Sequence, residues 1–201
     1  MNKKEEIIKR IEEHWDEKHF STIQRDYFID LFLNLKPKHL LETGFATGTS
    51  SLTTCYASQI SNAPEDSPLK SISVTIFSGD EERGAKTRAH LEDNFNFKLI
   101  QSRSKEVFNS DFFKREYPDG IDFFFVDGGH SFSECLFDLT EAFPYMAKNG
   151  VIAVDDYHSK TCPFPDIDRA VDGFYEENRT ELEKNFVQHP DGKGTCFLKK
   201  K

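Results

Sequence analysis

The sequence predicts an α/β fold in which helices cover both faces of a mostly parallel sheet, with an antiparallel edge at the C-terminus. Three observations lead to this prediction. From residue 38 onward, short apolar runs alternate with amphipathic stretches, as in repeated βαβ units. Two of these runs, IDFFFV and VIAV, are apolar on consecutive residues, which is typical of strands buried on both faces. The tail, NFVQHPDGKGTCFLKK, predicts two short strands around a turn.

Two helices are expected before the first strand. The first is predicted by apolar residues that share one helical face, Ile7, Ile8, Ile11 and Trp15. The second begins at Ser21, which forms a capping-box pattern with Gln24, and ends before Pro37. A further capping-box pair, Ser131 and Glu134, fixes the start of a later helix. We expect strands near 39–44, 71–77, 97–101, 121–127 and 150–155, and helices near 48–60, 81–94, 104–114, 132–147 and 166–178.

Length and composition favour one domain, 1–201, with N-terminal helices over 1–36 and an α/β core over 38–201. The net charge of −9 disfavours a nucleic-acid partner, which requires clustered positive charge. The longest uncharged stretch, 43–64, is rich in polar residues, so no membrane segment is expected. The N-terminus does not have the pattern of a secretion signal, and four scattered cysteines suit reduced thiols. We therefore expect a cytoplasmic protein, and the amphipathic N-terminal helices leave a homo-oligomer possible.

Acidic residues follow two of the predicted strands. Asp127 comes directly after IDFFFV, and Asp155 and Asp156 come after VIAV. If the two strands are parallel neighbours, their ends lie ~4.8 Å apart, and the carboxylates would repel one another unless a cation joins them. Hard oxygen ligands suit Mg²⁺ or Mn²⁺. The alternative is that these aspartates only cap the helices or turns that follow.

A glycine-containing turn, LLETGFATGTSS, follows the first predicted strand. Its glycines would let the backbone approach a ligand closely. A dinucleotide-binding fingerprint would need glycines where this stretch has Ala46 and Thr49, and a phosphate-binding Gly-Lys-Ser/Thr motif is absent. The position favours a ligand site, because open parallel sheets bind ligands where strand order reverses. A simple tight turn is the competing interpretation.

Three stretches together resemble the class I S-adenosylmethionine-dependent methyltransferases, and within them the small metal-dependent O-methyltransferases of the macrolide sugar type. These stretches are LLETGFATGTS, FFFVDGGHSFSECLFDL and NGVIAVDDYH. The resemblance covers about residues 38–178 and implies a Rossmann-like, doubly wound, seven-stranded sheet. It also implies a cofactor site that includes Glu42, Gly44, Phe45, Gly48, Ser50, Arg103, Ser104 and Asp127. Arg103 and Ser104 would lie near the adenine, and a solvated loop is the competing interpretation for these two. The family has an acid at the end of the second strand to hold the ribose, whereas this chain has Ser78 and Gly79 there, with Asp80 slightly later. Asp80 is our ribose candidate, and the competing interpretation is that it only favours the start of the next helix.

The resemblance also implies a catalytic role for His130, beside Asp127. A bound cation would lower the pKa of an acceptor hydroxyl, and a neutral imidazole could then remove its proton. His130 could instead be a metal ligand or a surface residue at a helix start. The expected activity is methyl transfer to a hydroxyl of a small molecule, with Asp127, Asp155 and Asp156 as metal ligands. Two other functions stay open, a metal-dependent hydrolase and a non-catalytic module that binds S-adenosylmethionine.

Overall fold

The structure is a computed structural model that describes residues 1–14, 20–62, 70–76, 81–161 and 163–201. Its strands are β1 (His39–Thr43), β2 (Lys70–Thr75), β3 (Asn96–Gln101), β4 (Ile121–Val126), β5 (Met146–Val154), β6 (Leu182–Gln188) and β7 (Gly194–Lys200). Within these residues, seven strands form one sheet in the order β3-β2-β1-β4-β5-β7-β6. Strands β1 to β5 run parallel, while β7 is antiparallel to both β5 and β6. The predicted α/β sheet with an antiparallel C-terminal edge is confirmed.

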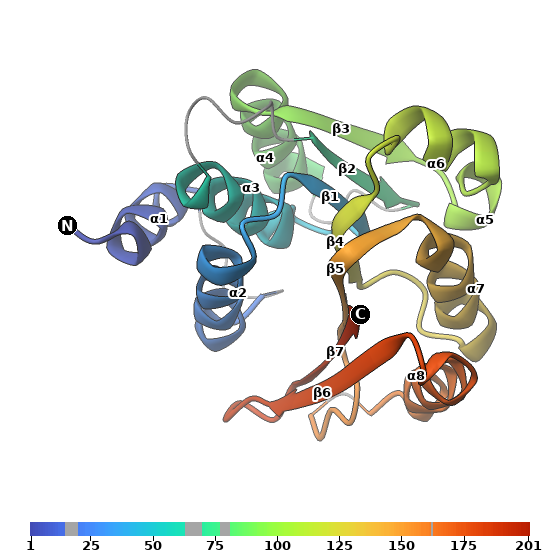
Figure 1. The fold of residues 1–201 in the computed structure, drawn as a ribbon. Helices are drawn as coiled ribbons and strands as arrows, with labels where there is room; N and C mark the ends of the chain where they lie inside the picture. The colour runs from blue at the N-terminus through green and yellow to red at the C-terminus, as the bar shows by residue number, and fades with distance from the viewer. Residues whose placement is uncertain (15–19, 63–69, 77–80, 162) are drawn as a thin grey trace.

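Helices cover both faces of the sheet (Figure 1). One layer contains α1 (Lys3–Glu12), α2 (Thr22–Leu35), α3 (Thr49–Ser61) and α4 (Glu81–Asn94). The other contains α5 (Ser104–Val107), α6 (Ser110–Glu116), α7 (Phe132–Ala142) and α8 (Pro165–Asn178). No helix within the described ranges combines the length and the hydrophobicity that crossing a bilayer requires.

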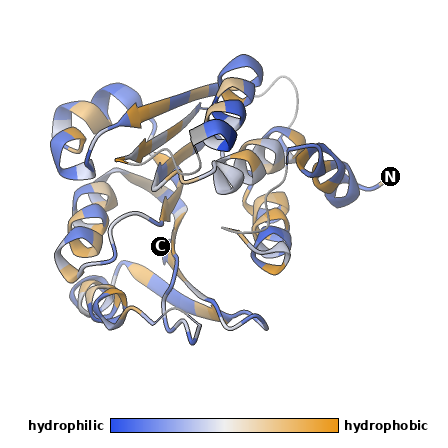
Figure 2. Ribbon diagram, turned by 180° about the vertical axis from the view of Figure 1, so that it is seen from behind, coloured by the Kyte–Doolittle hydropathy of each residue, from blue (hydrophilic) through white to orange (hydrophobic). Residues whose placement is uncertain are grey.

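Strand β4 contributes to the core on both of its faces. Phe123 and Phe125 belong to the hydrophobic cluster under α1–α4, whereas Phe124 between them belongs to the cluster under α5–α8. This follows from the alternation of side chains along a strand. Phe28 of α2 packs edge-on against Phe123 and Phe125, with ring centroids 5.5 and 5.1 Å away. Figure 2 shows hydrophobic strands at the centre of the molecule and a largely hydrophilic α1 at its surface.

The two predicted helix caps are present, but the reciprocal hydrogen bond of each capping box is not. In a full capping box, the side chain of Gln24 or Glu134 would accept a hydrogen bond from the backbone N–H of the capping serine. Ser21 Oγ accepts a hydrogen bond from the Gln24 backbone N–H at 3.2 Å, and Ser131 Oγ accepts one from the Glu134 backbone N–H at 3.3 Å. The Gln24 side chain instead reaches Asp155, and Glu134 accepts a hydrogen bond from Ser131 Oγ. The helix starts are therefore as predicted, while the side chain of Gln24 has a different role.

Two predicted helices differ from those in the structure. The stretch 104–114 forms two short helices, because Asn109 interrupts it and caps α6 by accepting from the Phe112 backbone N–H at 2.9 Å. The helix predicted over 132–147 ends at Ala142, followed by a 3₁₀ turn over Phe143–Tyr145. Pro144 in this turn has no N–H to continue the helix. Strand β5 accordingly begins at Met146 rather than at 150.

Candidate functional site

A crevice is expected where the order of strands reverses. Strand β1 has β2 on one side and β4 on the other, so the connections from β1 and β4 leave the same edge in opposite directions. Ligands of open parallel sheets bind at such a point, beyond the carboxyl ends of the strands. The Asp127 backbone N–H donates to the Thr43 carbonyl at 2.9 Å, so the loop after β4 lies directly against the loop after β1.

Gly44 makes this close approach possible. Its φ is +88°, and a Cβ atom there would lie 1.8 Å from the carbonyl oxygen of Asp127. Any side chain at this position would push the two loops apart, in addition to the strain that a positive φ imposes. The glycine of the first motif is therefore required by the contact between the two loops.

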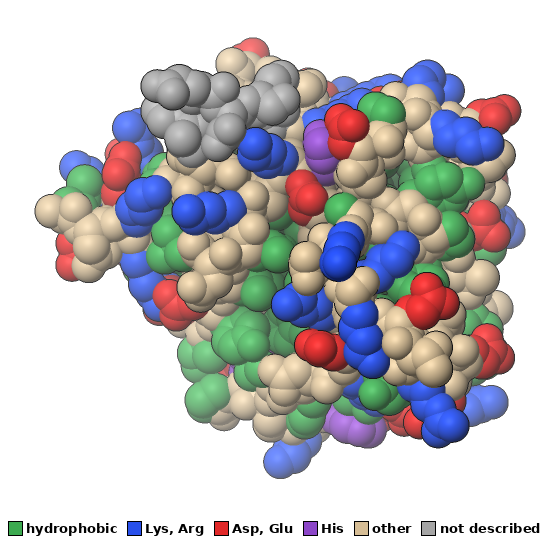
Figure 3. Space-filling view, viewed as in Figure 1, with side chains coloured by type: hydrophobic (Ala, Val, Ile, Leu, Met, Phe, Trp, Pro, Cys, Tyr) green, Lys and Arg blue, Asp and Glu red, His purple; other side chains and the backbone are tan. Residues whose placement is uncertain are grey.

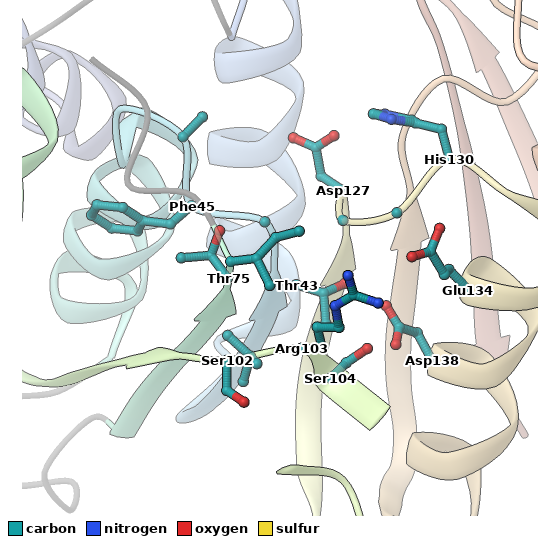
Figure 4. A pocket seen from close by; sticks show the side chains of 16 residues that line it. Thr43, Phe45, Thr75, Ser102, Arg103, Ser104, Asp127, His130, Glu134 and Asp138 are labelled. Carbon is teal, nitrogen blue, oxygen red and sulfur yellow. The ribbon is translucent and has the colours of Figure 1, made fainter. Parts of the chain in front are cut away.

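A pocket of about 450 Å³ opens at this edge (Figure 4), within the range of about 300–1,000 Å³ usual for small-molecule sites. Six of the residues predicted from the sequence line it: Gly44, Phe45, Arg103, Ser104, Asp127 and His130. The sequence interpretation missed the other lining residues: Thr43, Ala46, Val74, Thr75, Ile76, Ser102, Gly128, Gly129, Glu134 and Asp138. Thr43 and Thr75 end β1 and β2, and Ser102 follows β3, so position alone could have identified them.

Three other predicted residues lie behind the loop rather than along the pocket. Glu42 is buried and accepts hydrogen bonds from the hydroxyls of Ser50 and Ser51 at the start of α3. Burial raises the pKa of Glu42, and these hydroxyls lower it in part. A Cβ atom at Gly48, where φ is +79°, would lie 2.3 Å from the ring of Phe45. Glu42, Gly48 and Ser50 therefore shape the loop, and Asp80 lies outside the described residues.

Asp127, His130 and Asp156 come together at the mouth of the pocket. One ligand atom from each lies within 4.8 Å of the others, a spacing that could hold a metal ion. His130 Nε2 lies 3.3 Å from Asp156 Oδ2, and the imidazole stacks on Phe164 with ring centroids 4.2 Å apart. The hydrogen bond to Asp156 is the main reason that the pKa of His130 is raised. Asp156 has a φ of +56°, a conformation that Asp tolerates better than most residues and that occurs often at functional sites.

The chemistry of Asp127 fits a cation. Burial, followed by the negative charges of Asp155 and Asp156, raises the pKa of Asp127 well above its usual value. A divalent cation would replace this repulsion with attraction, and carboxylate oxygens are suitable ligands for Mg²⁺ and Mn²⁺. The carboxylates of Asp127 and Asp156 therefore fit the predicted Mg²⁺ or Mn²⁺, and the imidazole of His130 lies beside them.

Asp155 is not among the three grouped residues, and one of its carboxylate oxygens is held by residues outside the group. Its Oδ1 accepts hydrogen bonds from Gln24 Nε2 of α2 at 2.7 Å and from Thr195 Oγ1 of β7 at 3.3 Å. Burial and then the charge of Asp156 raise the pKa of Asp155 to about 6. The structure thus groups His130 with Asp127 and Asp156, where the sequence prediction grouped Asp155 with them. Gln24 was missed as a neighbour of the acids because its spacing from Ser21 indicated only a cap.

The fold and the pocket define an α/β protein with a small-molecule-sized pocket at the carboxyl edge of a parallel sheet. The sequence profile of a family described as methyltransferase domain matches residues 41–157, more than half of the chain. The chain belongs to this family, which confirms the resemblance to methyltransferases. A search of curated proteins finds no match.

Solved structures of O-methyltransferases share the fold. TomG from Streptomyces achromogenes, involved in tomaymycin synthesis and solved with S-adenosylmethionine, matches with a TM-score of 0.71 and 16% identity, over 100% of this chain and 90% of TomG. An O-methyltransferase from Bacillus cereus, solved with S-adenosylhomocysteine, has a TM-score of 0.67 and 15% identity, over 99% of this chain and 90% of its own. A putative O-methyltransferase from Klebsiella pneumoniae has a TM-score of 0.65 and 14% identity, and the match covers 100% of this chain and 90% of the Klebsiella chain.

Proposed function

We propose that the chain is an S-adenosylmethionine-dependent O-methyltransferase that uses a divalent cation to methylate a hydroxyl of a small molecule. One observation carries the proposal: Asp127 both lines the pocket at the β1–β4 crevice and belongs to the group formed with His130 and Asp156. Family membership supports methyl transfer. The ligands of the structural neighbours TomG and the Bacillus cereus enzyme support the choice of cofactor.

The cofactor would occupy the pocket. Gly44 and Phe45 line it after β1, and Arg103 and Ser104 line it after β3. We propose that these residues contact the cofactor together with Asp127. Glu42, Gly48 and Ser50 would contribute by holding the loop in shape, because Glu42 is tied to Ser50. Asp80 stays our candidate for binding the ribose.

Asp127 and Asp156 would hold the cation, and Asp155 would add negative charge from behind them. When bound, S-adenosylmethionine supplies the methyl group, and the cation lowers the pKa of the acceptor hydroxyl. Gln24 and Thr195 fix the carboxylate of Asp155 through the hydrogen bonds described above. Asp155 thus occupies a set position before any ligand arrives, which reduces the cost of ordering it.

His130 would accept the proton of the acceptor hydroxyl. Its side chain is 40% exposed, so an incoming molecule can reach the imidazole. Phe164 holds one face of the ring by stacking, and Asp156 lies beside Nε2. The carboxylate of Asp156 stabilises the imidazolium that forms when the proton is taken.

We propose a small hydroxylated acceptor rather than a nucleic acid. On the face shown in Figure 3, basic and acidic side chains are interspersed among the residues coloured there, and the whole chain carries a net charge of −9. Affinity for a phosphate backbone rests on clustered positive charge. A cytoplasmic location completes the proposal, and cell fractionation tests it, while analytical ultracentrifugation decides between a monomer and a homo-oligomer.

Calorimetry tests the function directly. We expect the purified chain to bind S-adenosylhomocysteine, and to bind Mn²⁺ in a manner that a chelator reverses. We also expect transfer of a labelled methyl group to members of a panel of hydroxylated compounds, with loss of transfer on chelation. Cation binding without cofactor affinity would instead indicate a metal-dependent hydrolase. Cofactor binding without transfer to any acceptor would indicate a binding module.

A further inference from the structure

The pocket has a second polar end, away from the Asp127 and His130 group. Figure 4 shows Asp138 and Ser104 together at this end, on the far side of the pocket from His130. Asp138 belongs to α7, on the side of the helix that packs against the sheet, between the buried Cys135 and Ala142. An acid in this position is unusual, because charged side chains are seldom fully buried without a partner.

Asp138 is 1% exposed, and its Oδ1 has no hydrogen-bond partner among the described residues. The hydroxyl of Thr43, which also lines the pocket, is buried beside Asp138 and makes no hydrogen bond of normal geometry, although it is near enough to affect the pKa of that carboxyl. Both side chains lie beside Gly128: a Cβ atom there would be 3.2 Å from Thr43 Oγ1 and 3.6 Å from Asp138 Oδ2. Two buried polar side chains therefore meet at one end of the pocket with hydrogen-bonding capacity to spare.

Such an arrangement lowers the stability of the ligand-free fold. Burial raises the pKa of Asp138 to about 6, although the nearby hydroxyls of Ser104 and Thr43 lower it in part. A buried acceptor without a donor costs free energy that a hydrogen bond from a ligand would recover. The pocket is therefore expected to bind a molecule that presents a hydrogen-bond donor at this end.

The proposed reaction indicates which part of the cofactor lies at the Asp138 end of the pocket. The sulfonium centre must lie near the Asp127 and His130 group, because the methyl group is transferred there. The resemblance places the methionine portion on the loop at Gly44, so the adenosine portion extends toward the other end. The purine lies farthest from the sulfonium along that portion, and its exocyclic amino group is a hydrogen-bond donor.

We infer that Asp138 Oδ1 accepts a hydrogen bond from the 6-amino group of the cofactor's adenine and so selects adenine over 6-oxopurines. The inference rests on the proposed function and deepens it, because it assigns purine selection to a helix residue that no sequence motif indicated. Thr43 and Ser104 flank the carboxylate and limit its movement.

Deaminated cofactor provides the test. S-inosylhomocysteine replaces the 6-amino group of S-adenosylhomocysteine with a carbonyl oxygen, which the carboxylate would repel. We expect the wild-type chain to bind S-adenosylhomocysteine at least about tenfold more tightly, as sites built around a hydrogen bond reject analogues that lack it. Equal affinities in the wild type would overturn the inference without any variant.

Variants separate purine selection from a structural role. Asp138→Asn can present either an acceptor or a donor, so we expect the preference for adenine to fall several-fold. Glu134→Gln, one turn earlier on α7 and also lining the pocket, is the matched control and should keep the wild-type preference. An unchanged preference in Asp138→Asn, even with uniformly weaker binding, would contradict the assignment.

A third probe distinguishes the two ends of the cofactor. 5′-Methylthioadenosine lacks the amino-acid portion, so Asp138→Leu should weaken its binding as much as that of S-adenosylhomocysteine. If only S-adenosylhomocysteine is affected, Asp138 binds the α-ammonium group and the inference is wrong. If the wild type binds none of these nucleosides, the proposed function itself fails.

Discussion

Two carboxylates at the ends of neighbouring strands have opposite surroundings. Glu42, in β1, accepts hydrogen bonds from Ser50 and Ser51, which offset part of the effect of its burial. Burial, followed by the negative charges of Asp155 and Asp156, raises the pKa of Asp127, which lies directly after β4. The first site is complete without a ligand, whereas the second has an excess of negative charge that a cation would compensate.

This comparison separates structural acids from functional ones. Both residues follow the same sequence pattern, an acid at the end of an apolar run, so the pattern alone cannot distinguish them. The distinction lies in which donors the rest of the chain brings to each carboxylate. Substitutions at the two sites should therefore affect different properties, stability at Glu42 and ligand binding at Asp127.

The largest effect is expected for Asp127→Asn. Loss of this charge should lower kcat/KM for methyl transfer by at least about 100-fold, because several kcal/mol of charge stabilisation disappear. Cation binding measured by calorimetry should be lost in parallel, while the circular dichroism spectrum stays unchanged. Asp119→Asn, at an exposed acid before β4, is the control and should behave as wild type. Normal cation affinity in Asp127→Asn would contradict the site.

Asp155→Asn should have a smaller effect. One oxygen of its carboxylate is held by Gln24 and Thr195, so we expect Asp155 to act on the cation by charge rather than by contact. We expect Mn²⁺ affinity to fall about tenfold, or about 1.4 kcal/mol, and S-adenosylhomocysteine affinity to stay nearly the same. Complete loss of cation binding would show that Asp155 is itself a ligand, as the sequence had suggested, and that it rotates toward the cation.

The pH dependence of stability tests the excess charge. Folding raises the pKa of Asp155 from its usual 3.8 to about 6, so the folded chain binds more protons than the unfolded chain between these values. The contribution of this group to stability therefore falls as pH rises from about 4 to about 6. A cation binds the ionised form, so Mg²⁺ should raise Tm by a few degrees at about pH 7.5 and by less at about pH 4.5. Equal shifts in differential scanning fluorimetry would contradict this.

The smallest effect on ligand binding is expected at Glu42. Glu42→Gln weakens the hydrogen bonds from Ser50 and Ser51 but keeps the shape of the side chain, so the free energy of unfolding should fall by about 1 kcal/mol in urea titrations. Cation affinity should change by less than about threefold, since Glu42 is the weakest of the negative charges acting on Asp127. A large loss of cation affinity would remove the contrast between the two acids.

Local patterns predicted most of the fold. Consecutive apolar residues identified β4 and β5, and Ser21 and Ser131 fixed two helix starts. The two helix predictions were wrong because Asn109 starts a new helix and Pro144 prevents the preceding helix from continuing. The spacing of apolar residues does not reveal either effect. For the site, the strand ends predicted Asp127 and Asp156. The direction of the Asp155 side chain depends on Gln24, 131 residues earlier in the chain, which no local pattern reveals.

The hydrogen bond between Gln24 and Asp155 affects how the chain could be shortened. A truncated form beginning at Lys38 would keep every described strand of the sheet. It would nevertheless remove the amide that anchors Asp155, and it would uncover Phe123 and Phe125, which now pack against Phe28. The two leading helices are therefore not a detachable extension, and attempts to obtain a minimal catalytic fragment should retain them.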